Sequence, residues 1–121
     1  MALPANISIY HGDTYEETWT LKQADGVTPY NLSGAKVWMT VKTAYSVADP
    51  GSLQISSPAS GIVFTDIPNG VINMTITAAQ SAALAVQTYV YDIQIKDVAG
   101  KIFTLTSGTF TVNPEVTITT T

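Results

Sequence analysis

The residue types that most often carry out chemistry gather in one short stretch, HGDTYEETW, which begins at His11. Glu16 and Glu17 are neighbours on an expected strand, so their side chains point to opposite faces and do not form a paired acid and base. His11 and Asp13 have no serine, cysteine or threonine nucleophile in a recognisable arrangement nearby. We therefore expect a turn at Gly12 that leads into a core strand, and no catalytic residues.

Composition argues against most other chemical functions. One histidine and no cysteine leave only carboxylates as metal ligands, and the chain contains neither a D-x-D-x-D-G calcium loop nor a glycine-rich phosphate loop. We expect no metal and no cofactor. With five lysines, no arginine and nine acidic residues, the net charge is −4, which disfavours nucleic acid and anionic membrane surfaces as partners. The N-terminus has no signal-peptide pattern and no window reaches roughly 18 apolar residues, so we expect a soluble protein made in the cytoplasm.

The elements that would position these residues are β-strands. Thr, Val, Ile and Tyr dominate, and turn signals recur about every eight to twelve residues, which is typical of a β-sandwich or barrel. Alternating apolar positions predict strands at 6–10, 14–23, 35–43, 61–66, 70–76, 88–97 and 101–113, with a further short strand at 53–56 inside the loop 44–60.

One short helix is expected at 77–84, where Thr77 and Gln80 have the spacing of a capping box. This helix would close one end of a sandwich. The tyrosines at 45, 89 and 91 are expected to be core or corner residues rather than sugar-stacking residues. Tyr89 follows the helical turn, where immunoglobulin-like sandwiches often place a tyrosine that ties back to the backbone.

The last predicted strand changes its apolar face partway along. Phe103 and Leu105 stand at odd positions, whereas Phe110 and Val112 stand at even positions. A continuous strand would expose one of these pairs, so we predict a β-bulge, and we place it at Gly108.

Two side chains do not fit the simple alternation. Trp38 lies on the polar face of its strand, so it is either covered by the loop 44–60 or part of an interface. Glu17 shares the apolar face of its strand. It lies either at the rim of the core, which we favour, or inside it with a hydrogen bond to a tyrosine hydroxyl.

The tail offers a second interface candidate. Pro114 lacks a backbone donor and should end the last strand, which leaves an extended arm at 114–121 that consists of Pro114 and EVTITTT. We expect this arm to add a strand to a neighbouring subunit's sheet, with Val116 and Ile118 in alternate pockets. Alternatively, the tail continues the last strand of its own sandwich past a bulge at Pro114.

One family resemblance extends over nearly the whole chain. ADGVTPYNLSGAKVWMTVK resembles the D-G-x-P-x-D-L-T-G-A pattern of the immunoglobulin-like module in upper baseplate and tail-fibre-linked proteins of tailed bacteriophages. Asp25-Gly26 and Pro29 occupy the turn, and 31–35 occupy D-L-T-G-A with Asn31 and Ser33 as departures. One extra residue stands in the turn. The upstream YHGDTYEETWTLK, the downstream ITAAQSAALAVQTYVYDIQIKDVAGK and the closing GTFTVNPEVT are also similar to this family.

The resemblance implies a single immunoglobulin-like β-sandwich over 1–113, all-β except for the short helix. It also implies a non-enzymatic structural protein of a virion assembled in the host cytoplasm. Such a protein would be an adaptor at the tail, baseplate or fibres, with other virion proteins, and itself as a homo-oligomer such as a trimer, as partners. Two alternatives stand beside it, a capsid decoration protein and a host-glycan-binding module that uses Trp38 and the tyrosines.

Overall fold

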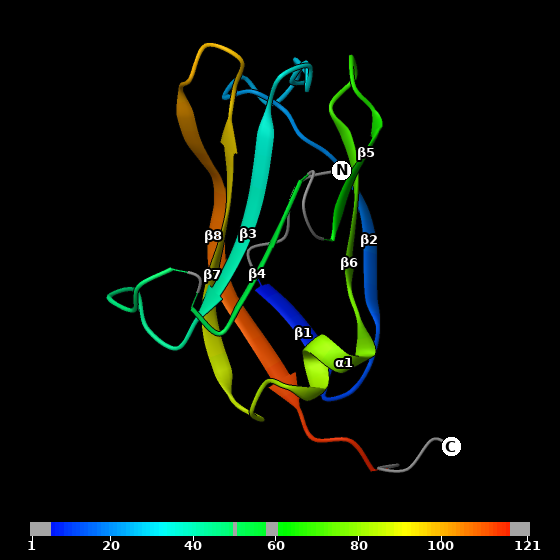
Figure 1. Cartoon of the computed structure of the whole chain (residues 1–121), viewed down its shortest axis with the longest axis vertical. Helices are drawn as coiled ribbons and strands as arrows, with labels where there is room; N and C mark the ends of the chain where they lie inside the picture. The colour runs from blue at the N-terminus through cyan, green and yellow to red at the C-terminus, as the bar shows by residue number, and fades with distance from the viewer. Residues whose placement is uncertain (1–5, 50, 58–60, 117–121) are drawn as a thin grey trace.

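Two β-sheets pack face to face in this protein, and a short helix lies at one end (Figure 1). The structure is a computed structural model that describes residues 6–49, 51–57 and 61–116. Its elements are β1 (Asn6–Tyr10), β2 (Tyr15–Thr20), β3 (Lys36–Lys42), β4 (Leu53–Ser56), β5 (Ile62–Asp66), β6 (Val71–Ile76), α1 (Ala78–Ala82), β7 (Thr88–Lys96) and β8 (Ile102–Asn113). The strands expected from the alternation, including the short β4, are all present.

The order of the strands defines the fold. One sheet has the order β1-β8-β7-β3-β4, and the other has the order β2-β6-β5. Neighbouring strands are antiparallel, except that β1 runs parallel to β8 along the sheet edge. With β2 taken as strand B, this is the immunoglobulin arrangement of B, E and D against C, F and G, with C′ added beside C. The chain is therefore an immunoglobulin-like β-sandwich.

The core lies between the inner faces of the two sheets. The alternation of β7 holds there, because its odd-numbered residues from Tyr89 to Ile95 are buried while its even-numbered residues are more exposed. From β2, Trp19 enters the same core with 2% of its surface exposed. The largest fully buried side chains are those of Leu21, Leu32, Met39, Ile55, Ile72, Met74, Ile76, Ile93, Ile95 and Phe110.

The helix forms where its capping signal predicts it. The Thr77 hydroxyl accepts a hydrogen bond from the Gln80 backbone N–H at 3.1 Å, and the Gln80 side chain accepts one from the Thr77 N–H at 2.9 Å. Helix α1 lies across the lower end of the sandwich in Figure 1. Just beyond it, the Tyr89 hydroxyl donates to the Ala85 carbonyl at 3.0 Å, which confirms the predicted tyrosine corner.

The predicted bulge in β8 exists, but its predicted position was wrong. Gly108 pairs regularly with Tyr91, whereas Ile93 faces Thr106 and Gln94 faces Thr104. The residue without a partner is therefore Leu105, and the change of face occurs there. The sequence shows only that the change falls between the two apolar pairs. In the structure the apolar face changes earlier, at Leu105. Thr106 therefore lies on the core face, where its side chain hydrogen-bonds Tyr91.

Candidate functional site

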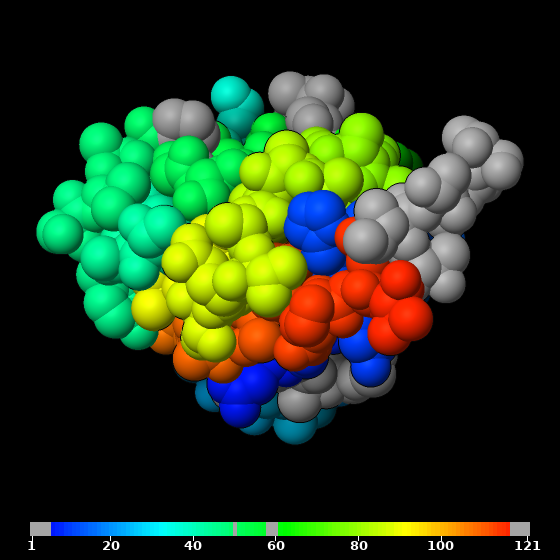
Figure 2. Space-filling model, turned by 90° about the horizontal axis from the view of Figure 1, so that it is seen from below, coloured from blue at the N-terminus to red at the C-terminus, as the bar shows by residue number. Residues whose placement is uncertain are grey.

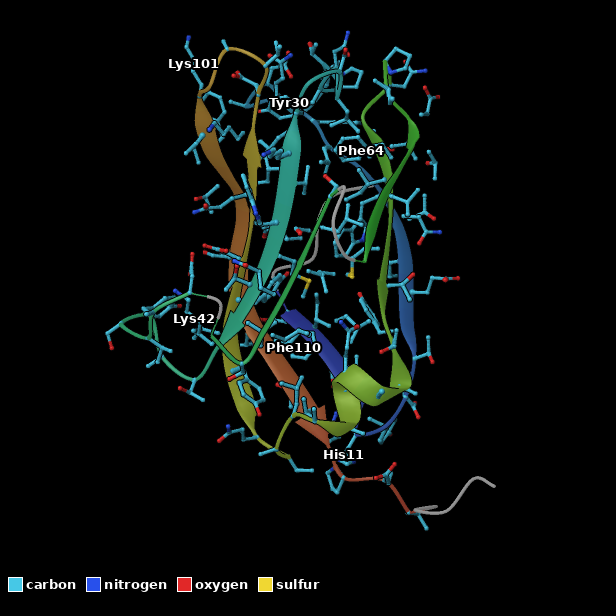
Figure 3. The ribbon with its side chains drawn as sticks, viewed as in Figure 1. His11, Tyr30, Lys42, Phe64, Lys101 and Phe110 are labelled. Carbon is cyan, nitrogen blue, oxygen red and sulfur yellow. The ribbon has the colours of Figure 1, made fainter. Side chains whose placement is uncertain are left out.

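The HGD turn fastens three parts of the chain to one another. Gly12 has a φ of 84°, so it makes the turn that was predicted. The His11 backbone N–H donates to the Asn113 carbonyl at 2.8 Å, and the His11 ring contacts Glu115 Oε1 through Nδ1 at 2.7 Å and the Ala82 carbonyl through Nε2 at 2.9 Å. One histidine thus bridges the helix and the first residues of the arm, at the lower end of Figure 3.

These contacts favour the charged form of His11. A carbonyl oxygen accepts hydrogen bonds, as does an ionised carboxylate, so both ring nitrogens act as donors when the imidazole is protonated. The hydrogen bond with Glu115 is the largest cause that raises the pKa of His11 above its ordinary value, and the Ala82 carbonyl acts in the same direction. Desolvation opposes both effects.

Asp13 belongs to the same fastening through its backbone. The buried Ser81 hydroxyl in α1 donates to the Asp13 carbonyl at 2.7 Å. We call His11, Asp13, Ser81, Ala82 and Glu115 the end clamp. Figure 2 views this end of the molecule and shows the first turn, the helix and the end of β8 side by side. The stretch that looked most chemical is thus a structural fastening.

The two glutamates of this stretch are separated as expected. Glu16 is exposed and accepts a hydrogen bond from the Thr75 hydroxyl at 3.2 Å, whereas Glu17 is half-buried on the other face of β2. Glu17 lies near Tyr15, and burial followed by the charge of Glu17 raises the pKa of Tyr15 to about 12. The half-buried position agrees with the favoured rim placement of Glu17.

The turn that begins at Asp25 is held by hydrogen bonds from the backbone and from a side chain to the Asp25 carboxylate. Asp25 Oδ1 accepts hydrogen bonds from the N–H groups of Val27 and Thr28, and Oδ2 accepts one from the Thr28 hydroxyl at 2.6 Å. These bonds, with the hydroxyl bond as the largest cause, lower the pKa of Asp25 to about 2. Leu32 is 1% exposed, and Gly34 has a φ of 73°. The motif therefore specifies a turn and its apolar anchor rather than a chemical site.

The interface residues predicted from the sequence lie apart from one another. Trp38 is half-buried on the outer face of β3, where it pairs in register with Gln94 and Ser56. Val116 is 98% exposed beyond the end of β8, at the opposite end of the sandwich from the start of β3 (Figure 1). Ile118 lies outside the described residues. The structure does not bring Trp38 and Val116 into one surface.

A polar hollow that no sequence pattern indicates lies on the outer face of the larger sheet. This loop hollow has a volume of about 180 Å³. It lies beside the loop that joins β3 to β4, which projects from the sandwich in Figure 1. Its lining residues come from β3, this loop, β7 and β8, and they are Thr40, Lys42, Tyr45, Asp49, Val90, Tyr91, Asp92, Gln94 and Ser107.

Tyr45 stands in this loop and is 76% exposed, so its expected place in the core or at a corner was wrong. An ion pair joins this loop to the end of β3. Lys42 Nζ lies 2.7 Å from Asp49 Oδ1, and Figure 3 shows Lys42 where β3 enters the loop. Tyr89 and Tyr91, in contrast, are buried as predicted.

Asp92 is the half-buried carboxyl group of the loop hollow. Burial raises its pKa, the nearby Lys42 lowers it and Asp49 raises it further, and the combined effect is upward. Gln94 Nε2 donates to Asp92 Oδ2 over 3.5 Å, which is the long limit for such a bond. The charge of Asp92 is therefore weakly compensated.

The described residues form neither a metal site nor a membrane-spanning helix. Within residues 6–49, 51–57 and 61–116, no three His, Cys, Asp or Glu side chains are grouped so that they could hold a metal ion. Over the same ranges, no helix has the length and apolar character needed to cross a membrane.

Fold and site together define the class of protein as an immunoglobulin-like sandwich with a clamped C-terminal arm and a polar hollow on its larger sheet. No protein-family model matches the chain, and no curated protein matches it. Among solved structures, it is similar to AggA, the major subunit of aggregative adherence fimbriae type I from Escherichia coli. The two chains are 14% identical over 91% of each, with a TM-score of 0.39. The strand order, rather than this distant likeness, defines the fold.

Proposed function

We propose that this protein is a non-enzymatic structural component of a tailed-phage virion, an adaptor that docks at the tail, baseplate or fibres through its terminal arm and its strand edges. The observation that carries the proposal is the way the arm leaves the sandwich. Strand β8 ends at Asn113, residues 114–116 form no strand, and Val116 is 98% exposed. An apolar, β-prone side chain presented in this way suits a strand that pairs with a neighbouring subunit.

The end clamp supports this role because it fixes where the arm begins. His11 holds Glu115 at 2.7 Å, two residues beyond the end of β8. Glu115 also packs against the first turn, since a side-chain carbon added at Gly12 would lie 2.8 Å from Glu115 Oε2. An arm with an anchored base loses less conformational freedom on docking than a free tail.

The sheets also offer open edges for pairing. β4 and β1 border the larger sheet, and β2 and β5 border the smaller one. β4 is only four residues long, and edges this short resist uncontrolled association. The similarity of the Asp25 turn to the phage module supports the placement in a virion, and the turn has the structural role that this similarity implies.

A truncation after Asn113 tests the arm. The shortened protein should melt within a few degrees of the full chain, because it loses only the partly exposed His11–Glu115 contact and Val116 contributes no core contact. It should nevertheless be depleted from purified particles. A matched variant, Val63→Ser, alters an exposed apolar residue elsewhere and should enter particles normally; Val63 is 62% exposed on β5. A large fall in melting temperature on truncation, with incorporation restored at low temperature, would assign the tail to its own sandwich and contradict docking.

Copy number tests the placement. Quantitative gel densitometry of purified virions should give a few to a few dozen copies of a tail adaptor. Hundreds of copies would indicate a capsid decoration protein instead. Absence from particles would refute the virion role altogether.

A further inference from the structure

The loop hollow contains an excess of hydrogen-bond acceptors and of negative charge. Its charged groups are one ammonium and two carboxylates, from Lys42, Asp49 and Asp92. Lys42 is already paired with Asp49 at 2.7 Å, and Asp49 remains 70% exposed in its side chain. Asp92 is the half-buried carboxylate of the hollow, and it shares the single lysine charge with Asp49. A ligand that complements this hollow would bring donors and positive charge.

The polar groups around Asp92 form a row across the sheet. Thr40 and Ser107 are its register partners on β3 and β8, and all three line the hollow. The Thr40 hydroxyl accepts a hydrogen bond from Gln54 at 3.0 Å, so it is held in place. A ligand that lies along this row meets the carboxylate between two hydroxyl groups.

An aromatic ring and an aliphatic side chain complete the lining. Tyr45 presents a largely exposed ring from the loop, and Val90 adds an apolar contact. A planar cation stacks on an aromatic ring more favourably than a compact ammonium group does, and it can also donate two parallel hydrogen bonds to one carboxylate. Both features of the hollow therefore select a guanidinium group over an amine.

From these contacts we propose that the loop hollow binds an arginine side chain of a partner protein, with the guanidinium group paired to Asp92 and stacked on Tyr45. The 121 residues contain no arginine, so none of them can supply this group to the hollow. This assignment names the chemistry of a partner and rests on the proposed docking function.

The test uses the intact protein and small probes, so that it is independent of particle assembly. Isotope-labelled protein is titrated with N-acetyl-arginine methylamide while amide and side-chain NMR signals are followed. The signals of Thr40, Tyr45, Asp92 and Gln94 should move together and saturate. N-acetyl-lysine methylamide should bind several-fold more weakly, and neutral galactose or N-acetylglucosamine should leave these signals unmoved.

Two variants assign the contacts. Asp92→Asn should weaken arginine binding about tenfold or more, because a charged hydrogen bond becomes a neutral one. Asp66→Asn is its matched control, since Asp66 is an aspartate of the other sheet, bonded to Asn69, and it should bind as the parent does. Tyr45→Ala, at an exposed position that carries no risk to folding, should weaken binding severalfold. Arginine binding should also fade as the pH falls through the raised pKa of Asp92, with Lys42 and Asp49 as the charged groups that face it.

The possible outcomes separate the two proposals. An absence of shifts, equal binding of the lysine probe, or loss of binding in Asp66→Asn would overturn the arginine assignment. Shifts with sugars alone would overturn it as well and would favour a glycan site. None of these results bears on whether the protein enters particles, which copy number and truncation decide separately.

Discussion

The two phenylalanines of β8 allow a quantitative test of how the last strand packs. Phe110 is fully buried and meets the Tyr91 ring edge-on, with the ring centroids 6.4 Å apart. Phe103 lies on the other side of the Leu105 bulge, faces Ile95 in register and is 43% exposed. The same substitution at both positions therefore compares a closed part of the sandwich with an open part, on one strand and with one chemistry.

The expected magnitudes follow from burial. Phe110→Ala removes a wholly buried ring, which typically costs about 3–5 kcal/mol because a cavity remains. Phe103→Ala removes a ring that is just over half covered and opens to solvent, so we expect about 1.5–2.5 kcal/mol in the free energy of unfolding. With roughly 3–6 °C lost per kcal/mol for a chain of this size, the melting temperature should fall by about 9–30 °C in the first variant and about 5–15 °C in the second.

Urea denaturation followed by tryptophan fluorescence measures both losses directly, because Trp19 lies in the core. Ile102→Ala is the control, since Ile102 is 59% exposed on the other face of β8 and should change stability by about 0.5 kcal/mol or less. Equal losses of unfolding free energy for the two phenylalanines would show that the sandwich is not more open around Phe103 than around Phe110. A greater loss at Ile102 than at Phe103 would show that the register above the bulge is wrong.

Three other predictions concern the corner, the clamp and the outer face. Tyr89→Phe should lower the free energy of unfolding by about 1 kcal/mol, because the hydrogen bond to the Ala85 carbonyl is lost and water only partly replaces it. A loss near zero would show that the corner does not stabilise the fold. The pKa of His11 in an NMR titration should lie above 6.5 and fall in Glu115→Gln, so that the clamp's stabilisation is present at low pH and lost as pH rises through the raised value; an unchanged pKa would contradict the pairing. Trp38→Ala should clearly reduce incorporation into particles while it lowers the free energy of unfolding only slightly. A large loss of stability with normal incorporation would make Trp38 a packing residue only.

Local patterns were enough to predict the parts of the fold that local chemistry decides. The Thr77–Gln80 capping box needs only four residues, and the alternation of β7 needs only nine, so both were readable in one dimension. Gly12 was readable because a histidine–glycine–aspartate step ahead of an alternating strand admits few conformations.

The bulge and the loop hollow required information that the sequence alone does not display. Which residue of β8 loses its partner depends on the fit against β7, and the flexible Gly108 was a weaker determinant than the placement of Thr106 opposite Ile93. The hollow combines residues from four segments, and the sequence pattern places its exposed aromatic residue, Tyr45, in the core or at a corner instead. The closeness of His11 to Glu115, 104 positions away, was likewise invisible in one dimension.

The parallel pairing of the first and last strands has a mechanical consequence. β1 and β8 run side by side through five paired positions, from Asn6 opposite Thr109 to Tyr10 opposite Asn113. The chain enters at the start of β1 and leaves at the end of β8, so tension between its two ends slides these strands along each other. The hydrogen bonds of all five positions then carry the load together, whereas in an unzipped hairpin they would break one after another. Single-molecule stretching through the two ends should therefore meet resistance until the strands part in one step, and gradual yielding at low force would contradict this. The paired edge between β1 and β8 thus resists shear when the two ends of the fold are pulled apart.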